Sequence, residues 1–237
     1  FKNEEQVNKE LQKIKNKKVL ILGDSIIDEY TFCEALGKSG KEAVLNFKEI
    51  NTEQYLGGSI AIANNLSSFC KEVKLISFLG SDNKYQNFIK KKLYNNVKFL
   101  SFKKKNSTTI VKKRLVENID KVKLLGIYNL DETEINDNET KMFLKSIKEN
   151  IKKYDVILVA DFNHGILNNK ITKYISNNIS GNYNLMCQMN SSSMSNFAIK
   201  KYKNANLIVV NEREIRHEQR DKTTDLEKLI KKFVTEY

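Results

Sequence analysis

The sequence predicts an α/β fold in which helices cover a mostly parallel central sheet, with a small antiparallel β lid beside it. Short, nearly all-apolar runs alternate with helical segments, as is typical of strands buried in a parallel sheet. Two stretches with turn residues and few helix signals interrupt this alternation, and their strands fit better in a separate sheet. The 237 residues, 40% of them hydrophobic, suffice for one large domain.

The amino-terminal part is expected to contain the first strands and the first lid segment. An amphipathic helix over residues 4–16 should form a linker, about residues 1–17, that follows a preceding domain. The run KVLILG, Lys18–Gly23, predicts the first buried strand, and residues 30–56 predict the first lid segment. A helix from about Ser59 to Cys70, a strand from Val73 to Leu79 and a helix over 84–94 should follow.

The remainder of the chain predicts the second lid segment and then a regular alternation. Three strands are expected over 97–102, 108–116 and 122–130, and we assign residues 97–130 to the lid. Helices are expected over 137–152, 168–178, 193–201 and 223–235, and strands over 155–160, 183–188 and 206–210. Because right-handed crossovers join such strands into a parallel sheet, the main domain should span 18–237.

The net charge, hydrophobic pattern and cysteine content argue against nucleic-acid-binding, membrane-spanning and secreted classes of protein. The net charge of +12 is compatible with nucleic-acid binding, but the lysines are scattered among acidic residues and disfavour it. No apolar run approaches the length of a membrane span, and the first residues do not resemble a secretory signal. The three cysteines, Cys33, Cys70 and Cys187, lie far apart without metal-ligand spacing, which predicts reduced thiols in a cytoplasmic protein.

Polar residues follow two early strands at the sheet edge where ligands of parallel sheets bind. Asp24 and Asp28 follow the first strand, where two carboxylates can accept hydrogen bonds from the hydroxyls of a polyol. A capping Asp beside a solvated Asp explains the same spacing equally well. Gly57-Gly58 opens a helix, either to let the backbone approach a ligand closely or to make a simple tight turn.

Two later strands are also followed by candidate site residues. Asp161 and His164 come after the strand DVILVA, and the lone histidine fits a surface position as well as a site. Asn211 and Glu214 follow the strand LIVV and could hold a hydrated Mg²⁺ near phosphates. An N-cap asparagine with first-turn acidic residues is an equally good interpretation of these two positions.

The order of these motifs resembles the PfkB family of carbohydrate kinases over nearly the whole chain, from about Lys18 to about Phe233. Within that family it is most similar to the kinase half of bifunctional heptose-phosphate kinase/nucleotidyltransferases. The matching stretches are GDSIIDEY at 23–30, similar to GD-x-x-x-D-x-Y; LGG at 56–58, where that group has Pro-Gly-Gly; TIVKKR at 109–114, similar to T-I-T-K-x-R; DFNHG at 161–165, similar to D-Y-x-K-G; and Asn211 with Glu214, which match N-x-x-E.

The resemblance implies a ribokinase-like three-layer sandwich that uses ATP and Mg²⁺ to phosphorylate a sugar or sugar phosphate. It implies that Asp28 binds sugar hydroxyls, with Asp24 beside it. It also implies that Lys112 and Arg114 bind a phosphate of the substrate, across a homodimer formed through the lid. Further implied sugar-site residues are Gly57, Gly58, Asn65 and Asp161. Implied residues of the nucleotide site are Asn211, His164 and Glu214, the last also as a metal ligand.

Three positions depart from the family pattern. Ala61 stands where the family has a sugar-contacting Asn, and Gln188-Met189-Asn190 stands where it has D-P-K. No G-A-G-D segment, which in the family supplies an anion hole and the Asp base, follows Asn211. The resemblance therefore places the catalytic Asp beyond Tyr237 and predicts a kinase domain with an incomplete carboxyl terminus that is inactive by itself.

Two other functions remain open beside the kinase of a longer chain. The first is a catalytically degenerate ribokinase-like domain that binds a sugar nucleotide or mediates assembly of a nucleotidyltransferase–kinase fusion, which Ala61 and Gln188 favour. The second is a basic nucleic-acid-binding protein. The expected partners are a sugar or sugar-phosphate substrate and a second copy of the chain, with neither nucleic acid nor membrane.

Overall fold

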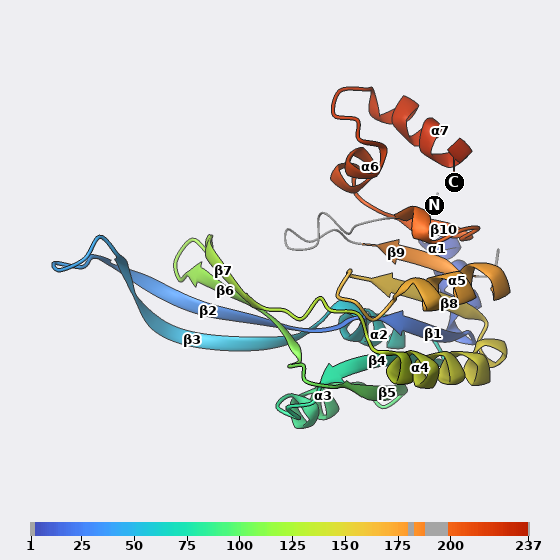
Figure 1. Cartoon of the computed structure of the whole chain (residues 1–237), viewed down its shortest axis with the longest axis horizontal. Helices are drawn as coiled ribbons and strands as arrows, with labels where there is room; N and C mark the ends of the chain where they lie inside the picture. Colours follow the sequence, from blue (N-terminus) through green and yellow to red (C-terminus); the bar gives the residue numbers. More distant parts are fainter. Residues whose placement is uncertain (1–2, 180–182, 188–198, 237) are drawn as a thin grey trace.

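The computed structural model describes residues 3–179, 183–187 and 199–236. Its central sheet has six parallel strands in the order β10-β9-β8-β1-β4-β5 (Figure 1). The strands are β1 (Lys18–Gly23), β4 (Glu72–Gly80), β5 (Val97–Lys104), β8 (Val156–Asp161), β9 (Asn184–Cys187) and β10 (Leu207–Val209). The predicted parallel sheet is therefore confirmed within the described residues.

Helices cover both faces of this sheet because successive residues of its inner strands point to opposite sides. On β1, Leu20 and Leu22 pack with α4 (Asp137–Asn150) and α5 (Asn169–Asn178). The alternate residues Val19 and Ile21 pack in a second core with α2 (Gly58–Ser67) and α3 (Gln86–Lys92). The result is the predicted three-layer sandwich (Figure 1).

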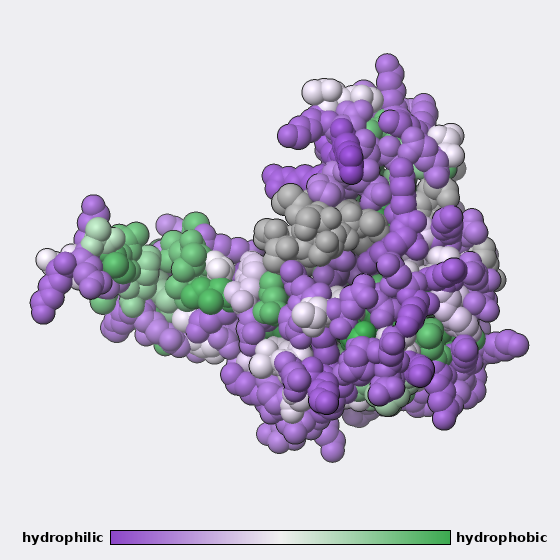
Figure 2. All heavy atoms as spheres, viewed as in Figure 1, coloured by the Kyte–Doolittle hydropathy of each residue, from purple (hydrophilic) through white to green (hydrophobic). Residues whose placement is uncertain are grey.

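The lid is a second sheet that projects from one end of the sandwich (Figure 1). Its strands run in the order β3-β2-β6-β7 and are β2 (Ser25–Lys38), β3 (Leu45–Gly57), β6 (Ile110–Glu117) and β7 (Lys123–Asn129). β2 pairs antiparallel with β3 and β6 pairs antiparallel with β7, so the predicted antiparallel lid is present, but β2 and β6 are parallel and make the lid sheet mixed. Apolar side chains gather on the lid surface (Figure 2).

The segment expected as the second part of the lid, residues 97–130, is divided between the two sheets. Its first strand, β5, pairs parallel with β4 in the central sheet. Side chains of β5 contact both cores, with Leu100 and Phe102 on one face and Val97 and Phe99 on the other. Both faces of β5 are covered by a core, which fits a place in the sandwich, whereas β6 and β7 pair with β2 and with each other and extend the lid, and β7 is exposed along its whole length.

The remaining elements lie at the two ends of the chain. The first helix, α1 (Glu4–Lys15), has no buried residue, and α6 (Glu212–Gln219) and α7 (Leu226–Glu236) follow β10. The described residues also contain two short 3₁₀ helices, Ile151–Lys153 after α4 and Ile199–Lys201 before β10. Most of the helix expected over 193–201 lies outside the described residues. No helix of the described segments has the length and apolarity needed to cross a membrane.

Candidate functional site: a carboxylate and cation cluster at the base of the lid

Asp28 lies within the lid strand β2, five residues after the end of β1, and its carboxylate contacts Arg114 on β6. Arg114 Nη1 donates a hydrogen bond of 2.6 Å to Asp28 Oδ1. The second carboxylate oxygen faces the start of α2, because a Cβ atom added to Gly57 would collide with Asp28 Oδ2. The parallel pairing of β2 with β6 thus brings two predicted substrate-binding residues, Asp28 and Arg114, together beside the predicted glycine, Gly57.

Two tyrosine rings flank the guanidinium of Arg114. Its central carbon lies 5.3 Å from the ring centroid of Tyr30 and 5.8 Å from that of Tyr128. These distances fit cation–π contacts, which hold the planar group in place. Tyr30 occupies the last position of the motif GDSIIDEY, but its ring contact with Arg114 depends on strand pairing that the motif does not reveal.

Lys112 lies two residues before Arg114 on β6, and both side chains therefore point to the same face of the lid. Lys112 is buried. Burial lowers the pKa of its ammonium group, whereas the carboxylates of Asp28 and Asp24 raise it and Arg114 lowers it further. The predicted pair of cations is therefore placed next to both predicted carboxylates.

Gly58 allows β3 and α2 to approach the end of β1 closely. Its φ is +56°, a left-handed conformation that L side chains rarely adopt, and a Cβ atom there would lie 2.5 Å from the carbonyl oxygen of Asp24. The backbone N–H of Ser59 donates a hydrogen bond of 2.9 Å to the same carbonyl. The glycine pair is thus required by the backbone geometry, and it also leaves the start of α2 without side chains that would block a ligand.

Asp24 is fully buried beside Asp161, and its Oδ2 accepts a hydrogen bond of 2.7 Å from the N–H of Phe162. Asp161 in turn accepts a hydrogen bond of 2.8 Å from the hydroxyl of Tyr202 and pairs with Lys201 Nζ at 2.6 Å. Burial and the nearby Asp161 carboxylate raise the pKa of Asp24 to about 7. The predicted residues Asp24 and Asp161 therefore form one buried carboxyl pair.

Lys201 and Tyr202 are site residues that the sequence analysis missed. They lie at the end of a short 3₁₀ helix about 40 residues after Asp161, in a lysine-rich stretch that resembles ordinary surface sequence. The burial of Tyr202 is the property that distinguishes this position, and it becomes visible only in the folded chain.

His164 is buried, and its Nδ1 lies 3.8 Å from a carboxylate oxygen of Glu132. Neither ring nitrogen has a hydrogen-bond partner among the described residues. Burial, followed by the charge of Lys112, lowers the pKa of His164 to about 3. The imidazole is therefore neutral near pH 7, and the implied place of His164 in the nucleotide site stays a prediction.

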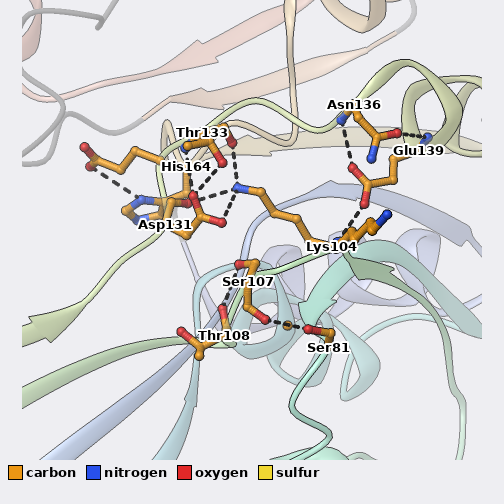
Figure 3. A network of polar contacts seen from close by, with 12 residues as sticks. Ser81, Lys104, Ser107, Thr108, Asp131, Thr133, Asn136, Glu139 and His164 are labelled. Atoms are coloured by element: carbon orange, nitrogen blue, oxygen red, sulfur yellow. Dashed lines mark hydrogen bonds and ion pairs between the residues drawn. The ribbon is translucent and has the colours of Figure 1, made fainter.

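A polar network holds the backbone beside His164 (Figure 3). Lys104 at the end of β5 donates hydrogen bonds to the carbonyls of Asp131 (3.2 Å) and Thr133 (2.6 Å), and its Nζ lies 3.1 Å from Asp131 Oδ2. A cavity of about 20 Å³, lined by Lys104, Asp131 and His164 among others, lies within this network. Its volume suits about one water molecule.

Asn211 and Glu214 form a capping box at the start of α6. The side chain of Asn211 accepts a hydrogen bond of 3.0 Å from the N–H of Glu214, and Glu214 Oε2 accepts one of 2.7 Å from the N–H of Asn211. The interpretation of Asn211 as an N-cap with first-turn acidic residues is therefore confirmed. Within the described segments no group of three or more metal-ligating side chains surrounds them, so Glu214 could hold Mg²⁺ only together with water and nucleotide phosphates.

The other predicted residues lie apart from the cluster or outside the described residues. Asn65 is exposed, about two turns along α2 from Gly58. Ala61 is half-buried on the same helix. Gln188-Met189-Asn190 lies outside the described residues. The site that the structure assembles therefore consists of Asp24, Asp28, Gly57, Gly58, Lys112, Arg114 and Asp161, joined by Lys201 and Tyr202.

Comparisons with solved structures support the same fold. A carbohydrate kinase from Agrobacterium tumefaciens superposes with a TM-score of 0.64 at 18% identity, over 91% of this chain and 67% of that one. Ribokinase from Arabidopsis thaliana, solved with ribose and ATP, superposes with a TM-score of 0.59 at 13% identity, over 92% of this chain and 68% of that one. At such identities the likeness concerns the ribokinase fold alone.

Among curated proteins, the chain is similar to bifunctional protein HldE from several bacteria. The protein of Aliarcobacter butzleri is 27% identical over 168 residues, which cover 69% of this chain and 34% of that protein. That of Helicobacter acinonychis is 29% identical over 206 residues, which cover 84% of this chain and 42% of that protein. The chain thus corresponds to roughly two fifths or less of these relatives. The model of the pfkB family carbohydrate kinases matches residues 16–237, and the chain belongs to that family.

Proposed function

We propose that this chain is the sugar-binding part of an ATP-dependent kinase that phosphorylates a sugar or sugar phosphate, as a heptose-phosphate kinase does, within a longer protein. The observation that carries the proposal is the placement of Asp28 between Gly57 and Arg114 at the base of the lid. Membership of the carbohydrate kinase family and the similarity to HldE proteins support it.

In this proposal each residue of the cluster has a binding role. Asp28 accepts hydrogen bonds from sugar hydroxyls, and the bare backbone of Gly57 and Gly58 lets the sugar ring approach the start of α2. Arg114 and Lys112 bind a phosphate group of the substrate from the lid. ATP with Mg²⁺ supplies the phosphoryl group, and the protein contributes mainly positioning and charge neutralisation.

Phosphoryl transfer also needs a base that takes the proton of the attacking hydroxyl. The family segment G-A-G-D that carries this carboxylate does not occur in the 237 residues. We therefore expect these residues alone to bind a sugar substrate without turning over ATP, and we place catalysis in the longer protein, in the cytoplasm.

The lid is our candidate for a homodimer interface. Its edge strand β7 is exposed along all seven residues, yet four of them are apolar or aromatic: Leu124, Leu125, Ile127 and Tyr128 (Figure 2). Exposed apolar surface on an unpaired edge strand commonly marks an interaction site. A second copy of the chain would cover this surface and bring two substrate sites close to one interface.

One observation favours a second candidate, a domain that binds a sugar nucleotide without catalysis. Asn211 and Glu214 hydrogen-bond to each other in the capping box, so they offer fewer free groups to a nucleotide and Mg²⁺. Ala61 stands where the family has an asparagine that contacts the sugar, so one sugar contact is lost. The two candidates differ in one measurable property, since only the kinase transfers phosphate from ATP to a sugar in the longer protein.

Calorimetric titration tests the proposal on the 237-residue chain. Mannose 6-phosphate and sedoheptulose 7-phosphate are the probes, and we expect at least one to bind at 1:1 stoichiometry. Asp28→Ala should weaken this binding roughly tenfold to a hundredfold, because hydrogen bonds to a charged group are lost. The control Asp120→Ala removes an exposed carboxylate from the β6–β7 turn and should leave binding unchanged. Absence of binding, or equal binding by Asp28→Ala, would refute the proposal.

A further inference from the structure

The strand β5 lies at the edge of the central sheet, and within the described residues only β4 pairs with it (Figure 1). The N–H of Val73 on β4 donates a hydrogen bond of 3.1 Å to the carbonyl of Asn96, directly before β5. Since bonds to a parallel neighbour involve every second residue, Phe99, Ser101 and Lys103 direct their backbone groups away from β4. The edge therefore presents a row of backbone donors and acceptors to which another strand can pair.

A groove runs beside this edge, between β5 and α3. Its volume is about 470 Å³, which is within the range of ligand-binding pockets. Apolar side chains from both elements and their neighbours line it: Leu79, Ile89, Leu93, Val97 and Phe99. Alternate side chains of a strand added to β5 would point to the same face as Val97 and Phe99. Apolar side chains at these alternate positions would therefore enter the groove.

Positive charge surrounds the groove. Lys90 of α3 lines it with an exposed side chain, and none of its described lining residues is acidic. Lys103 follows Ser101 on β5 by two residues and points to the same face, where its Nζ donates a hydrogen bond of 3.3 Å to the carbonyl of Gly80. A ligand that carries carboxylates beside an apolar centre therefore complements this surface in charge as well as in shape.

Two other occupants fit this edge less well than a separate acidic peptide. Two copies of β5 paired edge to edge would bring together their lysines, Lys98 and Lys103 among them, and like charges on paired strands are destabilising. The stretches of this chain outside the described residues contain no Asp or Glu, so none of them complements the lysines.

We propose that the edge of β5 and the groove beside α3 bind an extended, acidic peptide segment of a partner protein by strand addition. The backbone of the peptide pairs with β5, its apolar side chains fill the groove, and its carboxylates pair with Lys90 and Lys103. This surface shares no residue with the candidate sugar site. The inference therefore goes beyond the proposed function and does not depend on it.

Fluorescence anisotropy with a labelled peptide tests this inference on the 237-residue chain. The probe is Glu-Glu-Val-Thr-Val-Glu-Glu with capped ends, at physiological salt, and we expect saturable binding at 1:1 stoichiometry. Ser101→Pro removes an outward N–H without removing a bond to β4, and it should weaken binding roughly tenfold or more. Ser101→Ala keeps this N–H and should bind like the wild type. Equal binding by the two variants would contradict strand addition.

A pair of charge reversals on α3 tests the role of the lysines. Lys90→Glu should weaken binding of the probe roughly tenfold, because repulsion replaces an attraction between opposite charges. Lys92→Glu makes the same change at a position that lines a different groove, together with residues of β3, and it should bind like the wild type. Equal weakening by both variants would show a general effect of net charge and would overturn the proposed site.

Two N-methylated forms of the probe, titrated into the wild-type chain, make the test independent of how any variant folds. Methylation of the central threonine and methylation of both valines block N–H groups on opposite sides of an extended peptide. One form should lose binding and the other should keep it. Equal binding by both forms, or equal binding by Glu-Glu-Gly-Ser-Gly-Glu-Glu, would overturn strand addition in favour of attraction between charges.

Two further outcomes would also overturn the proposal. Absence of binding by the unmodified probe would show that the edge does not accept an acidic strand. A dimeric wild type that Ser101→Pro converts to a monomer would show that a second copy of the chain occupies the edge. Neither outcome bears on the titrations with sugar phosphates, so failure of this inference and failure of the proposed function are distinguishable.

Discussion

Asp24 combines complete burial with a neighbouring carboxylate, which makes its ionisation unfavourable. Both effects act in the same direction, and they raise its pKa to about 7 from an ordinary value of 3.8. Between these two pH values the folded chain keeps a proton that the unfolded chain has already released. Stability from this group is therefore present below about pH 4 and is lost as the pH rises toward 7.

The variant Asp24→Asn tests this linkage, because an amide cannot ionise and retains an oxygen for the N–H of Phe162. The free energy of unfolding of the variant relative to the wild type should rise between pH 5 and pH 8, on the order of 2 kcal/mol. Urea unfolding followed by circular dichroism at several pH values measures it. Asp120→Asn, at an exposed turn, is the control, and a pH-independent difference for Asp24→Asn would contradict the account.

At the scale of single residues, the sequence indicates some members of the candidate site but not those that only tertiary packing brings to it. Asp24 and Asp161 could be found because they directly follow buried strands, and Arg114 because TIVKKR resembles a family motif. The contacts of Lys201 and Tyr202 depend on where a short 3₁₀ helix packs, which periodicity does not reveal. For Asn211 and Glu214 the sequence could not distinguish two interpretations, because the same spacing of three residues fits both a capping box and a metal site.

Among the structural elements, the segment between β7 and α4 is tied to the central sheet by a lysine. Lys104 joins the end of β5 to the carbonyls of Asp131 and Thr133, and a Cβ atom at Gly165 would collide with the same Thr133 carbonyl. The lysine therefore fixes the segment that packs against the loop carrying His164.

Lys104→Met should remove this connection, which leaves two carbonyls without this donor and removes the cation beside the Asp131 carboxylate, while Thr133 still donates to that carboxylate. We expect the chain to lose about 3 kcal/mol of stability, which corresponds to roughly 6–12 °C in the melting temperature for a chain of this size. Differential scanning calorimetry measures the shift. Lys105→Met is the matched control, because its side chain is exposed and only its backbone N–H bonds to Glu139. Equal melting temperatures for the two variants would show that the network contributes nothing.

The elements also show why the lid was only partly predictable. The stretches 97–102, 108–116 and 122–130 have similar strand patterns and short turns between them, which is the pattern of a meander. The chain instead leaves the central sheet after β5 and enters the lid at β6. Partner choice depends on tertiary packing, and only the folded chain shows that the two faces of β5 contact the two different cores.

For the whole molecule, the lid presents apolar surface far from the body of the sandwich (Figure 2). Leu125 on β7 is 54% exposed, and Leu207 on β10 of the central sheet is 56% exposed. The two leucines thus have the same side chain and nearly equal exposure, and they differ in the sheet to which they belong. They form a matched pair for testing whether the lid mediates assembly.

Light scattering coupled to size exclusion provides that test. A dimer of the 27.5 kDa chain should elute with about twice this mass, and Leu125→Lys should shift it to the monomer. Leu207→Lys, with the same change in charge, should leave the dimer intact. A monomeric wild type at high micromolar concentration, or a dimeric Leu125→Lys variant, would contradict assembly through the lid.

Binding of a sugar phosphate at the base of the lid is tested most directly by a crystal structure of the chain with sedoheptulose 7-phosphate. We predict sugar hydroxyls within hydrogen-bonding distance of Asp28 and the phosphate on Arg114. A ligand bound elsewhere would contradict the account.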